Sequence, residues 1–155
     1  MLNNELLIKE LAGKYGRERS ALLPVLHGVA ERNNYLTEDD LTLIAKELDL
    51  SGAQVFGTAS FYSFFDLKPR GKYVIRLCKT ISCDMKNKDE IVNQIENTLK
   101  IKVGETTDDQ KFTFLFTNCM GWCDKSPSML INETPYSGLT PDKVNTILKE
   151  YQQRD

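Results

Sequence analysis

The sequence contains no apolar run of the roughly 18 residues that a membrane-spanning helix needs. Its start, Met1-Leu2-Asn3-Asn4-Glu5, has neither the basic cluster nor the long apolar stretch of a secretory signal. Positive charge is not in excess either: the formal net charge is −2, whereas a nucleic-acid binder needs a clustered surplus of lysine and arginine. We therefore expect a soluble, cytoplasmic protein with no direct membrane insertion and no nucleic-acid partner.

Histidine is also scarce, because the sequence contains His27 and no other. A Rieske-type iron–sulfur centre needs two histidine ligands, so this type of centre is excluded. The sequence has no Gly-x-Gly-x-x-Gly motif or other phosphate-cradling loop, which leaves no candidate site for a nucleotide. No Ser–His–Asp or paired-carboxylate arrangement stands out, so we assign no catalytic residues.

What the sequence does contain is the composition of an ordinary globular protein. Its 155 residues suit one domain, or one domain with a small appendage, and 41% of them are hydrophobic and 27% charged. The turn-like stretch Lys68-Pro69-Arg70-Gly71 separates two different hydrophobic patterns. We therefore expect two domains, over residues 1–70 and 71–155.

The first 70 residues repeat apolar side chains at helical spacing. Two helical faces are expected, one through Leu6, Leu7 and Leu11 and the other through Leu22, Leu23, Leu26 and Val29. Ser20 is a candidate N-cap for the second helix, although Pro24 falls late for a first-turn proline. Capping-box patterns over residues 37–40 and 51–54 open two more helices. These features predict a small helical bundle.

After Gly71 the pattern changes to that of an α/β domain. Three β-rich runs predict strands at residues 73–77, 112–116 and 128–131. Residues 88–100 carry apolar side chains three or four apart, which predicts a helix. Thr140-Pro141-Asp142 supplies the cap, the proline and the acid that open a last helix. Residues 132–138 are expected to form a turn.

All four cysteines lie in this second half, as the pairs Cys78/Cys83 and Cys119/Cys123. Each pair begins at or just after the end of a predicted strand, so the two loops can converge at one edge of a sheet. Four thiolates suit a tetrahedral zinc ion or an iron–sulfur cluster. In a [2Fe–2S] cluster each iron already holds two bridging sulfides and takes two protein ligands, which two cysteine pairs supply. Paired zinc ligands usually have two residues between them, so the longer first loop favours the cluster.

Other interpretations stay open at this point. The cysteines could hold zinc in an interaction module that has no redox role. A thioredoxin-like dithiol oxidoreductase is less favoured, because its cysteines usually have two residues between them and neither pair shows this spacing. A structural disulfide is disfavoured by the cytosolic character of the chain.

Several segments of the chain carry a family resemblance. They are Tyr35-Leu36-Thr37, residues 55–65 (Val-Phe-Gly-Thr-Ala-Ser-Phe-Tyr-Ser-Phe-Phe), the Cys78/Cys83 pair, Cys119-Met120-Gly121-Trp122-Cys123, and Leu139-Thr140-Pro141-Asp142-Lys143-Val144. Over nearly its whole length the chain resembles the thioredoxin-like [2Fe–2S] subunit family of NADH dehydrogenases and of NAD-linked hydrogenases and formate dehydrogenases. The resemblance implies an α/β protein with an N-terminal four-helix bundle followed by a thioredoxin-like [2Fe–2S] ferredoxin domain.

The same resemblance implies one [2Fe–2S] cluster, with Cys78 and Cys83 on one iron and Cys119 and Cys123 on the other. It implies a non-catalytic electron-transfer subunit that exchanges single electrons with the FMN of a partner subunit, which also binds NAD(H). Further iron–sulfur subunits are expected in such a complex. The complex would be an electron-bifurcating hydrogenase, a related enzyme, or a respiratory NADH dehydrogenase.

The chain departs from the family pattern beside the cysteines. The first ligand loop reads Lys79-Thr80-Ile81-Ser82, where the family commonly has small residues, and Trp122 stands where a small residue is usual. Neither change removes a ligand, but hydrogen bonds and solvent around the sulfur atoms set the potential. We therefore expect effects on cluster exposure, potential and docking. Gly121 is expected to let the backbone approach the sulfur atoms closely.

Overall fold

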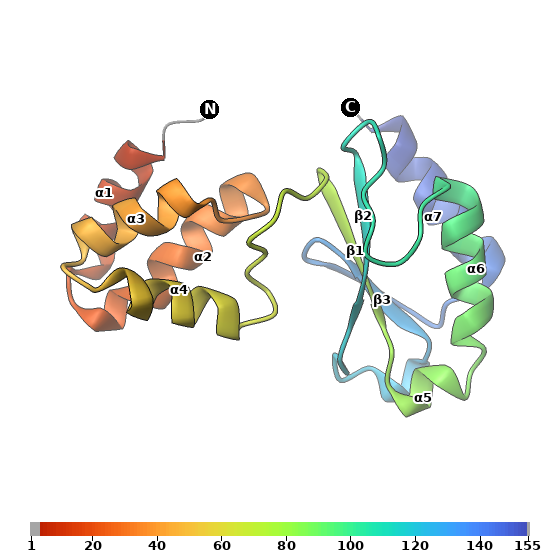
Figure 1. Cartoon of the computed structure of the whole chain (residues 1–155). Helices are drawn as coiled ribbons and strands as arrows, with labels where there is room; N and C mark the ends of the chain where they lie inside the picture. The colour runs from red at the N-terminus through yellow and green to blue at the C-terminus, as the bar shows by residue number, and fades with distance from the viewer. Residues whose placement is uncertain (1–3, 155) are drawn as a thin grey trace. The chain divides into compact units, whose positions relative to one another are not determined.

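The structure is a computed structural model that describes residues 4–154. Its internal contacts divide the chain into two compact units, an N-terminal unit, Met1–Pro69, and a C-terminal unit, Arg70–Asp155. Figure 1 shows helices alone in the first unit, and a sheet with helices in the second. None of the helices within residues 4–154 combines the length and the hydropathy that a membrane crossing requires.

The N-terminal unit is a bundle of four helices joined by short connections (Figure 1). The helices are α1 (Glu5–Tyr15), α2 (Leu22–Asn33), α3 (Glu38–Glu47) and α4 (Gly52–Phe61), with a 3₁₀ turn, η1 (Arg19–Ala21), before α2. Both predicted capping boxes are present: Thr37 and Asp40 exchange hydrogen bonds at the start of α3, and Ser51 and Gln54 do so at the start of α4. The expected helical bundle is therefore confirmed.

Two details of this bundle differ from the sequence-based expectations. In α1 the buried residues are Ile8 and Ala12. Of the predicted face, Leu7 and Leu11 pack against this core and are partly buried, whereas Leu6 is 76% exposed, so the prediction is wrong for Leu6. Ser20 is not the cap of α2, because the chain makes the turn η1 first and α2 begins at Leu22. Pro24 is then the third residue of α2, where a missing N–H costs nothing because first-turn N–H groups have no partner within the helix.

The C-terminal unit is a four-stranded sheet in the order β2-β1-β3-β4. The strands are β1 (Tyr73–Cys78), β2 (Phe112–Thr117), β3 (Ser128–Ile131) and β4 (Thr134–Ser137). The remaining elements are a single turn, α5 (Ile81–Asp84), the helices α6 (Lys88–Leu99) and α7 (Pro141–Gln153), and a 3₁₀ turn, η2 (Cys123–Lys125). β1 and β2 run parallel, whereas β3 is antiparallel to both β1 and β4.

The core of this unit lies between the sheet and the two long helices, which lie side by side on one face of it (Figure 1). Tyr73, Ile75 and Leu77 alternate along β1 and enter this core, together with the predicted helical stripe Ile91, Ile95 and Leu99 of α6. Alternation in the strand and three-to-four spacing in the helix place both sets of side chains on the same interface. The three predicted strands and both predicted helices are confirmed.

The stretch at residues 132–138, expected to be a turn, contains the edge strand β4. Its residues pair with β3, and the chain reverses at Asn132, which has a φ of 51°. Pro135 lies within the strand, and proline is tolerated there because an edge strand has one side without a hydrogen-bonding partner. Residues with the composition of a turn therefore form a short β-hairpin, in which β4 pairs with β3.

Candidate metal centre

The parallel pairing of β1 and β2 determines where the cysteines lie. Cys78 is the last residue of β1 and is paired in register with Thr117, the last residue of β2. The N–H of Lys79 donates to the carbonyl of Thr117 at 3.0 Å, so the pairing continues one residue into the first ligand loop. Because parallel strands end at the same edge of a sheet, the loop after Cys78 and the loop that carries Cys119 leave the sheet together.

The first pair, Cys78 and Cys83, is buried, and each residue is 1% exposed. The single turn α5 brings Cys83 back toward Cys78, because the carbonyl of Thr80 accepts the N–H groups of both Cys83 and Asp84 at 3.0 Å. Burial, together with a hydrogen bond from Cys83 to Cys78, raises the pKa of the Cys83 thiol. This pair is therefore a closed, water-poor half of the site.

The second pair, Cys119 and Cys123, is exposed. Its two sulfur atoms lie 3.1 Å apart, well beyond the roughly 2.05 Å of a disulfide bond. Gly121, with a φ of 91°, turns the loop so that its N–H lies 3.4 Å from Cys119 Sγ, as expected for a close backbone approach. The hydrogen bonds from Cys123 and from this N–H lower the pKa of Cys119, and the hydrogen bond to Cys119 raises the pKa of Cys123.

Hydroxyl groups lie beside the sulfur atoms of both pairs. Thr80 Oγ1 lies 3.1 Å from Cys78 Sγ, and Ser128 Oγ lies 3.9 Å from Cys83 Sγ. Thr80 also contributes a hydrogen bond that lowers the pKa of Cys119, and Ser82 does the same for Cys123. Since Thr80 and Ser82 belong to the loop of the first pair, the two cysteine loops lie near one another at this edge of the sheet.

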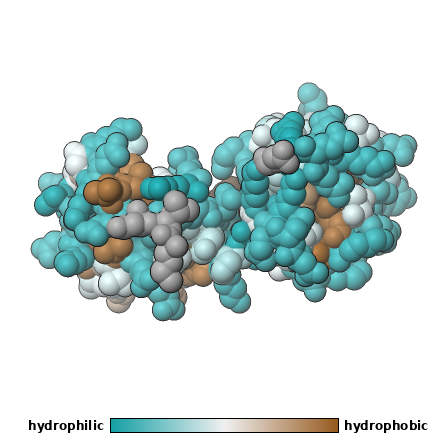
Figure 2. All heavy atoms as spheres, turned by 90° about the horizontal axis from the view of Figure 1, so that it is seen from above, coloured by the Kyte–Doolittle hydropathy of each residue, from teal (hydrophilic) through white to brown (hydrophobic). Residues whose placement is uncertain are grey.

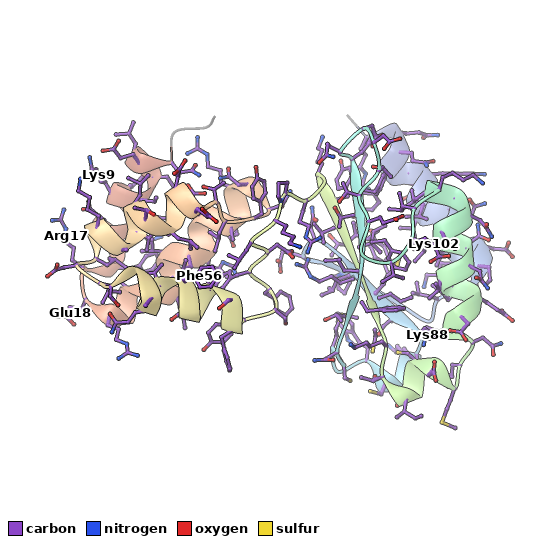
Figure 3. The ribbon with its side chains drawn as sticks, in the orientation of Figure 1. Lys9, Arg17, Glu18, Phe56, Lys88 and Lys102 are labelled. Atoms are coloured by element: carbon purple, nitrogen blue, oxygen red, sulfur yellow. The ribbon has the colours of Figure 1, made fainter. Side chains whose placement is uncertain are left out.

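Lys88 fixes the turn that carries Cys83. It is the first residue of α6 (Figure 3), and its Nζ lies 2.5 Å from the Asp84 carboxylate and 5.7 Å from the centre of the Phe116 ring. The hydrogen bond to Asp84 raises the pKa of Lys88, so the ammonium form is favoured. Lys88 thereby connects α5, α6 and the end of β2 beside the cysteines.

The residues that support the cysteines differ in how clearly the sequence signals them. The spacing of Asp84 and Lys88, four residues apart, is a typical ion-pair signal on a helix and could have identified that contact. Ser128 lies 45 residues from Cys83 in the chain, so only the pairing of β3 with β1 brings the two together. Thr80 lies inside a predicted ligand loop, but its hydroxyl carries no local signal.

The donor set consists of four cysteine thiols in two pairs. Among residues 4–154, no three His, Cys, Asp and Glu side chains are grouped closely enough to hold a single metal ion. The four predicted cysteines lie as two pairs, one buried and one exposed. Two pairs of thiolates are what the two irons of a [2Fe–2S] cluster take from a protein.

Apolar side chains lie next to the ligands along the chain. Ile81, Met85 and Phe116 are exposed, and Trp122 is half-buried at the start of η2. Figure 2 shows one face of the molecule, which is mostly hydrophilic, with hydrophobic atoms in small groups. In the N-terminal unit, Phe56, Phe61 and Phe64 are exposed as well, on α4 and in the segment that follows it (Phe56 is labelled in Figure 3).

Comparison with known proteins agrees with this fold and donor set. Residues 8–152 match the sequence model of the family described as thioredoxin-like [2Fe–2S] ferredoxin. The chain belongs to the thioredoxin-like [2Fe–2S] ferredoxin family, which confirms the resemblance seen in the sequence. Its cofactor is accordingly a [2Fe–2S] cluster.

The relatives are subunits of redox complexes. A subunit of the NADH-quinone oxidoreductase of Buchnera aphidicola is 36% identical over 153 residues, which cover 98% of this chain and 94% of that protein. The HndA subunit of the NADP-reducing hydrogenase of Solidesulfovibrio fructosivorans is 35% identical over 130 residues, which cover 84% of this chain and 76% of that protein. A crystal structure of NAD⁺-reducing [NiFe]-hydrogenase in the H₂-reduced state superposes with a TM-score of 0.76 at 25% identity. That match covers 86% of this chain and 22% of the hydrogenase chain.

Proposed function

We propose that this chain is an electron-transfer subunit of an NAD(H)-linked oxidoreductase complex and that its four cysteines hold one [2Fe–2S] cluster. Cys78 and Cys83 hold one iron, and Cys119 and Cys123 hold the other. The observation that carries this proposal is that β1 and β2 run parallel and end in register, so the two cysteine loops leave the sheet at the same edge. When bound, the cluster takes up or releases one electron at a time.

The protein contributes placement and shielding. β1 and α5 keep Cys78 and Cys83 away from water, whereas Cys119 and Cys123 face outward. The Gly121 N–H and the hydroxyls of Thr80, Ser82 and Ser128 supply hydrogen bonds to thiolate sulfur. The exposed pair leaves one side of the site open to a redox partner, and the cytoplasm keeps the thiols reduced for iron binding.

The partner in this proposal is a subunit that carries FMN and binds NAD(H), accompanied by further iron–sulfur subunits. Two kinds of relative support it: the subunits of NADH-quinone oxidoreductases and a subunit of an NADP-reducing hydrogenase. A flavin exchanges two electrons with a nicotinamide and can pass them on singly, which a one-electron carrier requires. This chain is then a non-catalytic part of an electron-bifurcating hydrogenase, a related enzyme, or a respiratory NADH dehydrogenase.

The cluster is tested by metal analysis of the full chain purified without oxygen. We expect a red-brown protein with about two irons and two sulfides per chain. Reduction with dithionite should give an EPR signal from a single [2Fe–2S]⁺ centre. A colourless protein with one zinc per chain would contradict the proposal. Insulin reduction that persists after all iron has been chelated would favour the dithiol alternative instead.

The partner is tested on the native complex, isolated through an affinity tag on this chain. We expect the complex to contain flavin, and NADH or NADPH to produce the [2Fe–2S]⁺ EPR signal without dithionite. The matched control is the isolated chain, in which neither nucleotide should produce the signal because the flavin subunit is missing. A complex without flavin, or a signal that nicotinamides produce in the isolated chain, would contradict the assignment of the partner.

A further inference from the structure

Thr80 is the N-cap residue of α5, but its hydroxyl does not cap the helix. In residues 4–154, four α-helical segments have a Ser or Thr at the N-cap: Thr37, Ser51, Thr80 and Thr140. The other three side chains accept an N–H of the first turn, at 3.1–3.3 Å. Thr80 makes no such bond. The backbone carbonyl of Thr80 accepts N–H groups of α5, as the N-cap carbonyls of the other three helices do, so only the use of its hydroxyl differs.

Because the Thr80 hydroxyl does not cap the helix, it can interact with the sulfur atom of Cys78. Thr80 Oγ1 lies 3.1 Å from Cys78 Sγ, within the range of a hydrogen bond to sulfur. A cysteine that ligates iron is a thiolate and has no proton of its own, so in the loaded site the hydroxyl must be the donor. The same side chain also helps to lower the pKa of Cys119 of the second pair. Thr80 therefore lies against the buried half of the site and influences the exposed half.

We propose that Thr80 is a positioning residue that sets the reduction potential of the site by donating a hydrogen bond to Cys78. This inference rests on the proposed function, because it takes Cys78 as an iron ligand. The reduced site holds one more electron than the oxidised site, and part of the added charge resides on the ligand sulfurs. A donor beside the sulfur stabilises the more negative, reduced state and raises the potential.

The hydroxyls of Thr80 and Ser128 differ in their distance from the nearest cysteine sulfur. Ser128 Oγ lies 3.9 Å from Cys83 Sγ, against 3.1 Å for Thr80 and Cys78. Because a hydrogen bond weakens steeply as it lengthens, the Thr80 hydroxyl has the larger effect. Removal of the Ser128 hydroxyl should shift the potential in the same direction by less.

The experiment compares Thr80→Val with the wild-type full chain in an anaerobic redox titration followed by EPR. Valine keeps the β-branched shape and removes the hydroxyl. At a fixed solution potential, the ratio of oxidised to reduced protein is expected to rise roughly fivefold to tenfold, equivalent to about 40–60 mV downward at 59 mV per tenfold. Thr80→Ser should stay near the wild-type value, and Ser128→Ala should fall between. Thr146→Val is the matched control, because that hydroxyl donates to the Asp142 carbonyl in α7.

Iron and sulfide analysis of each variant separates the two proposals. Wild-type protein without a [2Fe–2S] centre would overturn the proposed function itself. A loaded Thr80→Val protein with an unchanged midpoint potential would overturn only the role of Thr80. If Thr80→Val does not load, Thr80→Ala is titrated in its place, with the same two outcomes. Failure of both to load, while Thr80→Ser loads, would show that the hydroxyl serves assembly and would overturn the assignment to the potential.

Discussion

Replacing Cys78 with alanine is expected to abolish iron binding by the chain. Cys78 is 1% exposed at the end of β1, and the sequence has only four cysteines, so no spare thiol can take its place. Loss of a residue that merely supports a metal ligand costs roughly 10–100-fold in affinity, so loss of a ligand should cost at least as much. Iron per chain after anaerobic purification should fall by roughly tenfold or more, together with the visible absorbance and the EPR signal.

Val74→Ala is the matched control for this loss. Val74 lies on the same strand and is 2% exposed, so its truncation also leaves a small cavity but keeps all four thiols. It should cost about 2 kcal/mol of unfolding free energy, from two buried methyl groups and the cavity they leave. Iron content should stay at the wild-type level. A Cys78→Ala protein that retains a full complement of iron would contradict the assignment of Cys78 as a ligand.

The strands that carry the cysteines were predictable from the sequence for a physical reason. Residues 73–77 and 112–116 are rich in β-branched and aromatic side chains, which pack well on a pleated surface. The edge strand β4 has no such run, because Pro135 and the residues around it have the composition of a turn. The strand β4 forms because it pairs with β3, and not because its own residues favour a strand.

The apolar face of α1 illustrates a different limit. Its leucines offer more than one stripe at helical spacing, and periodicity alone does not decide which stripe meets the neighbouring helices. In the structure Ile8 and Ala12 are buried, and Leu6 faces solvent. The choice is made by packing against the rest of the bundle, which no window of local sequence contains.

Some features of the candidate site could likewise be predicted from the sequence, and others could not. Spacing and strand ends were sufficient to predict that the two cysteine loops leave the sheet at one edge, because parallel strands end together. Spacing did not reveal that one pair is buried and the other exposed, since this depends on how α5 folds over Cys83. The contact between Ser128 and Cys83 depends on a third strand and was equally out of reach.

Truncation of one buried isoleucine, Ile95→Ala, is expected to destabilise the C-terminal unit and the iron site together. We propose that the two units are domains that unfold separately. Ile95 lies on α6, is 0% exposed, and belongs to the core between the helices and the sheet that carries the cysteines. Its truncation should lower the unfolding free energy of this unit by about 2–5 kcal/mol. Loss of the visible absorbance in urea should then occur at a lower concentration than in the wild type.

Leu26→Ala is the counterpart in the N-terminal unit. Leu26 lies on α2, is also 0% exposed, and belongs to the separate core of the helical bundle. It should cost a similar 2–5 kcal/mol, roughly, in the unfolding of that unit followed by far-UV circular dichroism. The urea concentration at which the visible absorbance disappears should not change, because all four cysteines and their hydroxyl partners lie in the other unit. A shift of the absorbance transition by Leu26→Ala as large as that by Ile95→Ala would show that the chain unfolds as one cooperative unit and would refute the two-domain proposal.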